Sequence, residues 1–400
     1  MEYIKEKAKE IPVFGEYDVV VAGGGIAGIS AALAARRNGA KVLLLEKQFL
    51  LGGLATLGLI TIYLPLCDGK GKQVSFGIAE ELFHLSIKYG YEDKYPKPWL
   101  ENGTLEEKKK LRYEVRYNAN TAAILFEKLL LDEGVEILYG SSICDTVVSR
   151  NKITSLIIEN KSGRSAVVCK SVVDATGDAD VVYRSGEETD TFKQGNVLAG
   201  WYYFHNKNKL NLKMLGWSDI PEKFKSEEQK RLEKNLKRYQ GLDAKELSEM
   251  VCTSHAFTLD DYLKGGGISK ERNLALVATI PQIRMTRKIV SDYSIDDTEM
   301  HKEFSDSVGM FGDWRKSGPV YELPFSCLYG KTIKNLITAG RCISVTEAMW
   351  DITRVIPVCA VSGQAAGTAA ALSSNFKTLS ITKLQKQLKK DGVILHEKDL

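Results

Sequence analysis

Residues 18–56 constrain the fold of this chain more than any other stretch. They begin with Asp18-Val-Val-Val-Ala-Gly-Gly-Gly-Ile-Ala-Gly28, continue through an alanine-rich run to Lys41-Val-Leu-Leu-Leu-Glu46, and reach a glycine pair in Gly52-Gly53-Leu-Ala-Thr56. An apolar run, a glycine turn, a helix-forming run and a second apolar run are typical of a β-strand–turn–helix–strand unit. The sequence therefore predicts a Rossmann-type parallel sheet at the start of the chain.

The glycines of the turn have the spacing of a dinucleotide-binding motif. Gly23 permits the tight turn, Gly25 lets the backbone approach a pyrophosphate, and Gly28 lets the helix pack closely on the strand. The backbone N–H groups that open the helix face the phosphates, where the helix dipole favours negative charge. Because strand, helix and second strand all fall in the expected order, the pattern is more specific than an isolated glycine turn.

An acidic residue and a second glycine pair identify the dinucleotide. Glu46 ends the second strand, eighteen residues after Gly28, where its carboxylate can accept hydrogen bonds from a ribose hydroxyl and would repel a 2′-phosphate. Gly52 and Gly53 follow at once, and a close backbone approach there favours a ligand that extends beyond its pyrophosphate. These features favour FAD over NAD.

Composition excludes several classes of protein. The 400 residues exceed one comfortable core, so two lobes are expected. A net charge of +4 supports neither a nucleic-acid nor a membrane partner. The seven cysteines are odd in number and lack metal-type spacing, which favours a reducing cytosol and no metal. The charged N-terminus lacks the apolar segment of a signal peptide, and the longest apolar run, 54–66, is too short for a membrane span. We expect a soluble, cytoplasmic protein.

Downstream, helix-like and strand-like patterns alternate. Apolar residues at three- and four-residue spacings predict a helix over 118–133, followed by a strand over 135–139. Three alternating runs then predict a small antiparallel meander: 143–149, 153–159 and 165–173. The last run leads into a strand that ends in Ala175-Thr176-Gly177-Asp178, where the backbone is expected to approach the ligand a second time.

Residues 186–325 differ in character and predict a second lobe that faces the substrate. They hold an aromatic strand near 201–204, a charged helical insertion near 222–250 and alternation over 274–280. The chain then returns through a short strand over 335–341 and a helix that begins at Pro357, where proline suits the first turn.

The predicted fold is therefore α/β, with a discontinuous Rossmann-type FAD-binding domain that carries a three-stranded β-meander, plus a mixed α+β substrate lobe. We assign 1–60, 113–185 and 326–400 to the FAD-binding domain, and 61–112 and 186–325 to the substrate or cap domain. The apolar segment 57–66 is either buried structure or the wall of a cavity beside the flavin, and the sequence leaves both readings open.

The order of these motifs resembles the FAD-dependent oxidoreductases of the glutathione-reductase-like superfamily. The likeness is closest to the broad bacterial FAD-dependent oxidoreductase family, with a distant similarity to the fumarate reductase flavoproteins. It covers nearly the whole chain, including the closing Leu-Ile-Thr-Ala-Gly-Arg-Cys-Ile-Ser344 and Gly-Gln-Ala-Ala-Gly367. Arg284-Met-Thr-Arg287 and Leu323-Pro-Phe-Ser326 also resemble stretches of that family. These motifs are specific for FAD and poor at naming a substrate.

The resemblance implies non-covalent FAD and a set of cofactor contacts. The pyrophosphate would lie along the first glycine turn and the adenosine along the acidic strand end, with the ribityl chain beside the second glycine pair and the flavin pyrimidine edge near the last helix. The implied residues are Gly23, Gly25, Ile26, Ala27, Gly28, Glu46, Lys47, Gly53, Ala55, Thr56, Ile143, Ala175, Thr176, Gly177, Gly340, Arg341, Val355 and Ile356.

Six residues are candidates for the substrate side: Arg284, Arg287, His255, Tyr321, Trp350 and Arg354. Arg284 and Arg287, three residues apart, would share a helix face and could clamp a carboxylate or enolate. His255 could act as a general base. For each residue a structural role, such as a salt bridge or packing, competes with the catalytic one.

The predicted function is FAD-dependent hydride transfer with a small polar metabolite of the sugar-like or hydroxy-acid class. Alternatives are a fumarate-reductase-like ene-reductase, an RNA-modifying flavoprotein and a non-catalytic flavin-binding protein. Disulfide reduction is disfavoured, because Cys67 stands alone where related reductases carry paired cysteines. The electron acceptor or donor stays unknown, and a homo-oligomer is compatible with the sequence.

Overall fold

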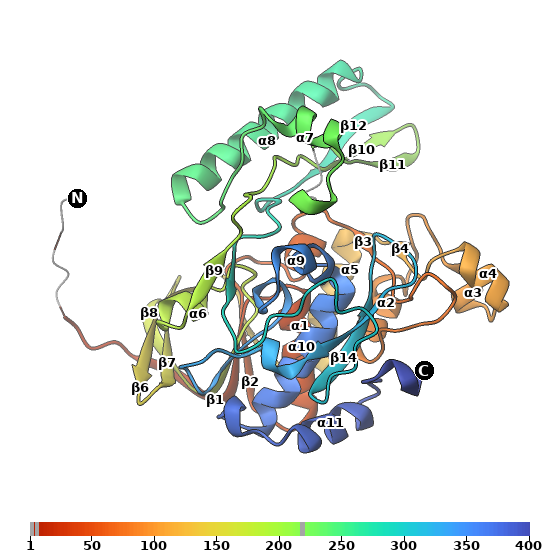
Figure 1. The fold of residues 1–400 in the computed structure, drawn as a ribbon. Coiled ribbons are helices and arrows are strands. Elements are labelled where there is room, and N and C mark those ends of the chain that lie inside the picture. Colours follow the sequence, from red (N-terminus) through yellow and green to blue (C-terminus); the bar gives the residue numbers. More distant parts are fainter. Residues whose placement is uncertain (1–3, 5–7, 217–220) are drawn as a thin grey trace.

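A computed structural model of the protein describes residues 4, 8–216 and 221–400. Figure 1 shows a large lower lobe built on a sheet and a smaller upper lobe capped by one long helix. The chain enters the upper lobe after six strands of the main sheet and then returns to the lower lobe, where the seventh strand joins that sheet, so the lower lobe is discontinuous in sequence.

A seven-stranded sheet organises the lower lobe, with the strand order β5-β2-β1-β8-β7-β6 and β16 added beside β8. The pairs β1–β2, β1–β8, β2–β5 and β8–β16 are parallel, so the predicted parallel-stranded α/β architecture is confirmed. The strands β6 and β8 each pair antiparallel with β7, which lies between them. Their bounds are β1 (Val13–Ala22), β2 (Val42–Leu45), β5 (Glu136–Leu138), β6 (Ser142–Ser149), β7 (Lys152–Asn160), β8 (Gly163–Asp174) and β16 (Leu336–Thr338).

The long strand β8 pairs with β1 along one edge and with two further strands along the other. Its first half pairs with β7, and its last residues pair with β16, which sets Leu336 beside Val172. The strands β1 and β2 are apolar over their paired residues and fully buried there, as expected for a parallel sheet covered on both faces. The carboxyl ends of β1, β2, β8 and β16 consequently lie at one edge of the sheet.

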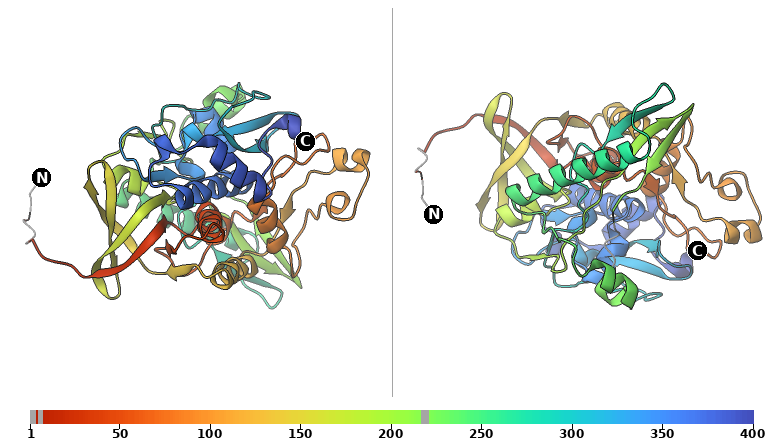
Figure 2. Two further views of the ribbon diagram at one scale, coloured as in Figure 1. Left: turned by 90° about the horizontal axis from the view of Figure 1, so that it is seen from below. Right: turned by 90° about the horizontal axis from the view of Figure 1, so that it is seen from above.

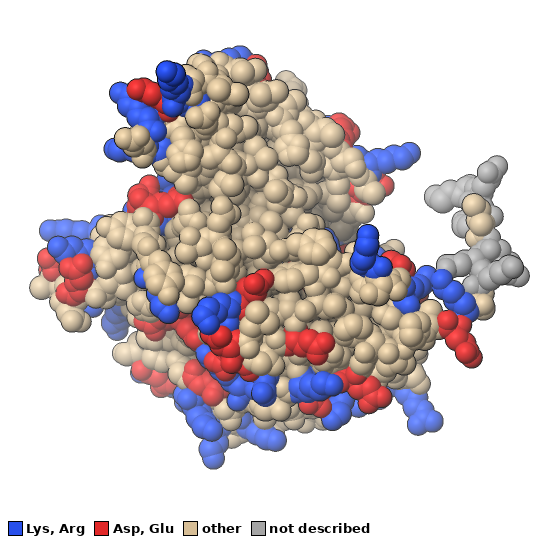
Figure 3. Space-filling view, turned by 180° about the vertical axis from the view of Figure 1, so that it is seen from behind, with Lys and Arg blue, Asp and Glu red and all other residues tan. Residues whose placement is uncertain are grey.

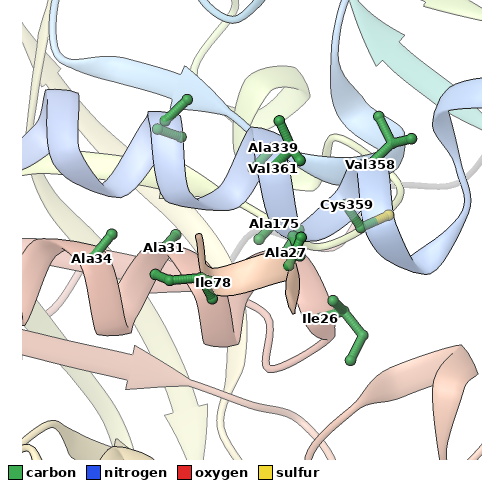
Figure 4. Close-up of a cluster of buried hydrophobic side chains, with 14 of the residues drawn as sticks. Ile26, Ala27, Ala31, Ala34, Ile78, Ala175, Ala339, Val358, Cys359 and Val361 are labelled. Atoms are coloured by element: carbon green, nitrogen blue, oxygen red, sulfur yellow. The ribbon is translucent and has the colours of Figure 1, made fainter. Parts of the chain in front are cut away.

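Two helices cross in close contact over this sheet: α1 (Ile26–Arg37) and α10 (Ile356–Leu372). Figure 4 shows their N-terminal ends side by side. A Cβ atom at Gly363 would lie 2.3 Å from the carbonyl oxygen of Ala27, and one at Gly367 would lie 2.0 Å from that of Ala31. The helices therefore approach to a distance that only glycine allows, and this contact fixes both N-termini at the same edge of the sheet.

Further elements complete the core of the lower lobe. Tyr63 and Leu66, from the apolar segment 57–66, are buried in the same hydrophobic cluster as α1 and α10, and so are Phe311 and Tyr321. The further elements of the lower lobe are β3 (Ile62–Tyr63), α2 (Ile78–Ser86), β4 (Val115–Arg116), α5 (Ala119–Asp132), α6 (Asp180–Arg184), β9 (Thr189–Thr191), β13 (Arg287–Ile289), β14 (Ser307–Gly312), β15 (Val320–Pro324), α9 (Glu347–Thr353) and α11 (Ile381–Lys390). The predicted boundaries between the two domains stay a prediction.

The upper lobe consists of a three-stranded sheet and the long helix α8, which lies in front of the lower lobe in the right-hand view of Figure 2. Its elements are β10 (Tyr202–Asn206), β11 (Lys209–Lys213), α7 (Glu227–Glu233), α8 (Ala244–Lys264) and β12 (Arg272–Val277). The helix α8 extends beyond the insertion predicted near 222–250. A separate arm carries the short helices α3 (Lys97–Leu100) and α4 (Leu105–Lys110).

Acidic and basic side chains are interspersed over the face shown in Figure 3, and few of them lie on the central surface between the two lobes. Among the described residues, no single helix has the length and apolarity needed to cross a membrane. The pair α9 and α10 passes that test only together, with a 92° bend between them.

Candidate functional site

The carboxyl edge of the sheet opens into a cavity of about 450 Å³. Its walls come from the strand ends of β1, β2 and β8, from the N-termini of α1 and α10, and from the upper-lobe segment 280–283. In open parallel sheets, ligands bind at this edge of the strands. The volume lies in the range of small-molecule and cofactor sites.

The first glycine turn is shaped by backbone contacts that exclude side chains. Gly23 has φ +99°, and a Cβ atom there would lie 2.6 Å from the carbonyl oxygen of Ala175. A Cβ at Gly28 would lie 1.8 Å from the carbonyl oxygen of Gly23. Gly25 is different, because its φ of −70° suits any residue and a Cβ there would meet no atom within 4 Å. Gly25 therefore borders open space in the cavity.

Two helix N-termini point to this space without side-chain caps. The N-cap residues are Gly25 for α1 and Val355 for α10, and neither provides a side-chain hydrogen bond. The first-turn N–H groups of a helix have no partner within the helix and carry its positive dipole end. The site is thus suited to the phosphates of a dinucleotide and to a ring that becomes negatively charged.

The second glycine pair lies directly against the first turn. Gly52 has φ +103° and Gly53 has φ +54°. The N–H of Gly52 donates to the carbonyl oxygen of Gly24 at 2.8 Å. Gly53 lies so close that its Cβ would be 3.3 Å from the Cα of Gly25. The floor of the cavity is therefore bare backbone, over which a long cofactor can lie.

Glu46 ends β2 with its carboxylate in a fixed orientation. One oxygen accepts the N–H of Gly24 at 2.7 Å, and the other accepts the N–H of Gln48 at 2.7 Å. The side chain is buried and lines the cavity. Because a carboxylate has about four acceptor positions, each oxygen keeps one for a ribose hydroxyl.

Most of the residues implied for the cofactor line this one cavity. The exceptions are Gly28, which packs beneath Gly23, Thr56, whose hydroxyl donates to Leu51, and Val355 at the N-cap of α10. The implied residues that line it are Gly23, Gly25, Ile26, Ala27, Glu46, Lys47, Gly53, Ala55, Ile143, Ala175, Thr176, Gly177, Gly340, Arg341 and Ile356.

Of the six candidates for the substrate side, Arg354 lines the cavity. The expectation that Arg284 and Arg287 share a helix face is wrong, because Arg287 begins strand β13 and residues 278–286 form no helix. Arg287 instead binds Asp180 at 2.8 Å. Arg284 lies over the ring of Trp201.

The other three candidates lie away from the main cavity. His255 lines a smaller cavity beside α8. The Tyr321 hydroxyl donates to the carbonyl oxygen of Asp297, and the indole N–H of Trp350 donates to that of Arg341. Tyr321 and Trp350 are both buried, and their positions are those of packing residues.

Two acidic residues in the cavity wall, Asp178 and Asp180, are not among the predicted site residues. Asp178 accepts the hydroxyl of Thr286 at 2.8 Å and lies 3.6 Å from a guanidinium nitrogen of Arg341. Burial and the nearby charge of Asp178 raise the pKa of Asp180 above its ordinary value. Asp178 belongs to the Ala-Thr-Gly-Asp strand end, so its motif was the signal that could have identified it.

The residues that the upper lobe contributes to the cavity were not predicted from the sequence either: Gly241, Leu247, Ile280, Pro281 and Ile283. The position of Ile280, Pro281 and Ile283 depends on how the segment 279–284 is held. The N–H of Thr279 donates to the carbonyl oxygen of Leu57, and Gln282 bridges the carbonyl oxygen of Gly58 and the N–H of Trp201. No local pattern predicts such long-range contacts.

The cysteines form no disulfide, and all seven are free. Cys359 lines the cavity from the first turn of α10, and burial raises the pKa of its thiol to about 12. Burial also raises the pKa of the Cys67 thiol. Both thiols are therefore neutral at physiological pH and poor nucleophiles.

Residues 18–246 and 205–388 match the family described as FAD dependent oxidoreductase. The chain belongs to this family. The predicted class is thereby confirmed: the protein is an FAD-dependent oxidoreductase, and FAD is its cofactor. The glycine turns, the uncapped helix ends and Glu46 fit a dinucleotide of this kind.

A curated relative and several solved structures are similar to parts of the chain. Over 159 residues it is 31% identical to a thioredoxin reductase of Ureaplasma parvum serovar 3, a match that covers 38% of this chain and 49% of that protein. The chain thus spans about half the length of that relative.

Among solved structures, a geranylgeranyl bacteriochlorophyll reductase-like protein of Thermoplasma acidophilum has a TM-score of 0.47 at 15% identity, covering 94% of this chain and 84% of that one. A 3-ketosteroid dehydrogenase of Rhodococcus jostii reaches 0.46 at 15% identity, with coverages of 90% and 98%. A flavocytochrome c3 fumarate reductase reaches 0.42 at 14%, with coverages of 90% and 78%. Structural similarity with TM-scores below 0.5 and sequence identities of 14–15% says nothing about the activity of this chain.

Proposed function

We propose that the protein transfers hydride between a small hydroxy acid and the flavin N5 of FAD. The observation that carries this proposal is one continuous cavity that has the acidic strand end at Glu46 and also the arginine side chain of Arg354 in its wall. When bound, FAD supplies hydride-transfer chemistry that no side chain can provide.

The chain's own residues bind and orient the cofactor. The N-terminus of α1 and the bare backbone at Gly25 accommodate the pyrophosphate, and Glu46 accepts the hydroxyl groups of the adenosine ribose. The N-terminus of α10, next to Val355 and Ile356, stabilises negative charge on the flavin pyrimidine edge. Ile280, Pro281 and Ile283 of the upper lobe form part of the cavity wall.

Within the predicted substrate classes, the lining favours a hydroxy acid over a sugar. The upper lobe contributes apolar side chains to the cavity, namely Leu247, Ile280, Pro281 and Ile283. Sugar hydroxyls facing such walls would lose hydrogen bonds to water without replacement. Arg354 offers a partner for one carboxylate.

Arg354 also suits a second candidate, a fumarate-reductase-like ene-reductase, in which an arginine near the flavin would donate a proton. The two functions differ in direction. The hydroxy-acid reaction removes hydride from substrate and reduces the flavin, whereas the ene reaction consumes reduced flavin.

The test follows the visible flavin band of the FAD-loaded protein without oxygen. A panel contains hydroxy acids, sugars and α,β-unsaturated acids, the last offered to protein reduced beforehand with dithionite. Bleaching by a hydroxy acid supports the proposal, and reoxidation by an unsaturated acid supports the ene-reductase. A flavin that responds to no compound contradicts both and favours a flavin-binding role without catalysis or an RNA substrate.

A further inference from the structure

We propose that Arg354 is a pre-oriented binding site for the carboxylate of a substrate whose remaining body is apolar. This inference rests on the proposed function, because it names the substrate class of the same cavity. It adds that affinity depends on one carboxylate and on apolar contact, and not on the substrate hydroxyl.

The orientation of Arg354 is the first observation. Its Nε donates to an oxygen of Asp351 at 3.1 Å, and its Nη2 donates to the same oxygen at 2.5 Å. The side chain is only 12% exposed and lines the cavity. Among the described residues no hydrogen-bond partner is found for Nη1, so one edge of the guanidinium is held while donors remain for a ligand.

A buried network holds this orientation. The Asp351 side chain is 2% exposed, and its second oxygen lies 3.5 Å from Nη1 of Arg315. Arg315 in turn binds the fully buried carboxylate of Asp313. The indole N–H of Trp314 donates to the backbone carbonyl of Asp351 at 2.9 Å, and the Trp314 ring lies 6.0 Å from the Arg354 guanidinium. Arginine held on one side in this way loses little freedom when a carboxylate binds on the other.

The other cationic side chains of the cavity have different positions or partners. Arg341 donates to the carbonyl oxygens of Ile283 and Arg284 and lies near Asp178. Lys47 directly follows Glu46 at the end assigned to adenosine, and Arg184 donates to the carbonyl oxygen of Cys144.

Arg354 immediately precedes the N-terminus of α10, the end assigned to the flavin ring. Of these four cations, it is therefore the one placed to bind a substrate beside that ring.

The apolar wall is the second, independent observation. Leu57 from the lower lobe and Leu247, Ile280 and Pro281 from the upper lobe line the same cavity as Arg354. Burial of apolar ligand surface against such residues contributes affinity in proportion to its area. A carboxylate on an aromatic or alkyl body matches this combination, and acetate or a sugar acid matches it less well.

The probes are redox-inert, so that binding is measured apart from turnover. Benzoate is titrated into the FAD-loaded protein by calorimetry and by the flavin difference spectrum, beside acetate, benzamide and gluconate. The expected order has benzoate tightest, with acetate and benzamide weaker by roughly tenfold or more, since one lacks the apolar body and the other the charge. Equal affinity for benzamide and benzoate, or tighter binding of gluconate, overturns the inference.

Variants identify the residue responsible. R354Q is expected to weaken benzoate binding by roughly ten- to hundredfold. Because that change leaves Asp351 short of a partner, the double variant R354Q/D351N removes the pair together and keeps the interior free of an unpaired charge. The control is R231Q, at an exposed arginine of α7 in the upper lobe.

In the double variant, FAD affinity should stay within a few fold while benzoate binding is lost. Unchanged benzoate binding in folded R354Q/D351N refutes the role of Arg354, and so does a loss of FAD affinity as large as the loss of benzoate affinity. The proposed function has its own readout, since a flavin bleached by neutral alcohols but by no carboxylate contradicts this inference and leaves hydride transfer standing.

Discussion

Gly25 offers a way to separate cofactor binding from folding. Its φ of −70° and ψ of 179° suit alanine, and the Cβ of an alanine there would meet no protein atom within 4 Å. The substitution Gly25→Ala should therefore leave the apo-protein intact. By restricting the unfolded chain it should raise the free energy of unfolding slightly, by about 0.4–1 kcal/mol.

The same methyl group should obstruct the cofactor. It would project into the space where α1 presents its first N–H groups, and a pyrophosphate held there would have to move away from them. Loss of one or two hydrogen bonds to a charged group costs about 1.5–3 kcal/mol each. We therefore expect the Kd for FAD to rise roughly tenfold to a hundredfold or more.

Two measurements on the same apo-protein check this reasoning. Guanidinium denaturation gives the free energy of unfolding, and titration with FAD by calorimetry gives the Kd. An unchanged Kd in Gly25→Ala would refute the assignment of this space to the pyrophosphate. A large loss of apo stability would instead show that the space beside Gly25 is filled by protein.

Three further predictions follow from the described contacts. Gly367→Ala places a Cβ 2.0 Å from a carbonyl oxygen of α1, so the free energy of unfolding should fall by about 1–3 kcal/mol. Denaturant titration measures this change, and an unchanged midpoint would contradict the close contact between the two helices. Glu46→Gln removes the charge that faces the ribose, so calorimetry should show FAD affinity falling about tenfold. Retention of full affinity would exclude this role of Glu46. Burial raises the pKa of Asp174 from 3.8 to about 6, so its contribution to stability is greatest below pH 4 and is lost as the pH rises through 6. Unfolding measured from pH 4 to 7 should therefore show wild type losing stability relative to Asp174→Asn, and parallel curves would disprove it.

Local sequence patterns predicted the elements that build the cofactor end of the site. Gly23, Glu46 and Gly53 stand at strand ends or turns, where residue type and backbone conformation are tightly linked. Parallel strands bring their carboxyl ends to one edge, so motifs far apart in the chain meet there without further information. This is why the strand end at Ala175 could be assigned to the same cavity as the first turn.

The substrate end was predicted poorly for a physical reason. Arg284 and Arg287 were expected on a helix because their spacing matches a helical turn, but the segment is extended and its position is set by contacts with the lower lobe. The lining residues Leu247 and Ile283 are ordinary apolar residues, and only the long-range fold distinguishes them from core. Arg354 was among the six candidates for the substrate side, while its buried partner Asp351 was not.

The most direct test of the account is an experimental structure of the protein with FAD bound. The account predicts one FAD per chain, with its pyrophosphate over Gly25, its adenosine ribose at the Glu46 carboxylate and its flavin ring at the N-terminus of α10, within reach of Arg354. FAD bound elsewhere, or bound with its flavin ring at the Glu46 end of the cavity, would contradict it.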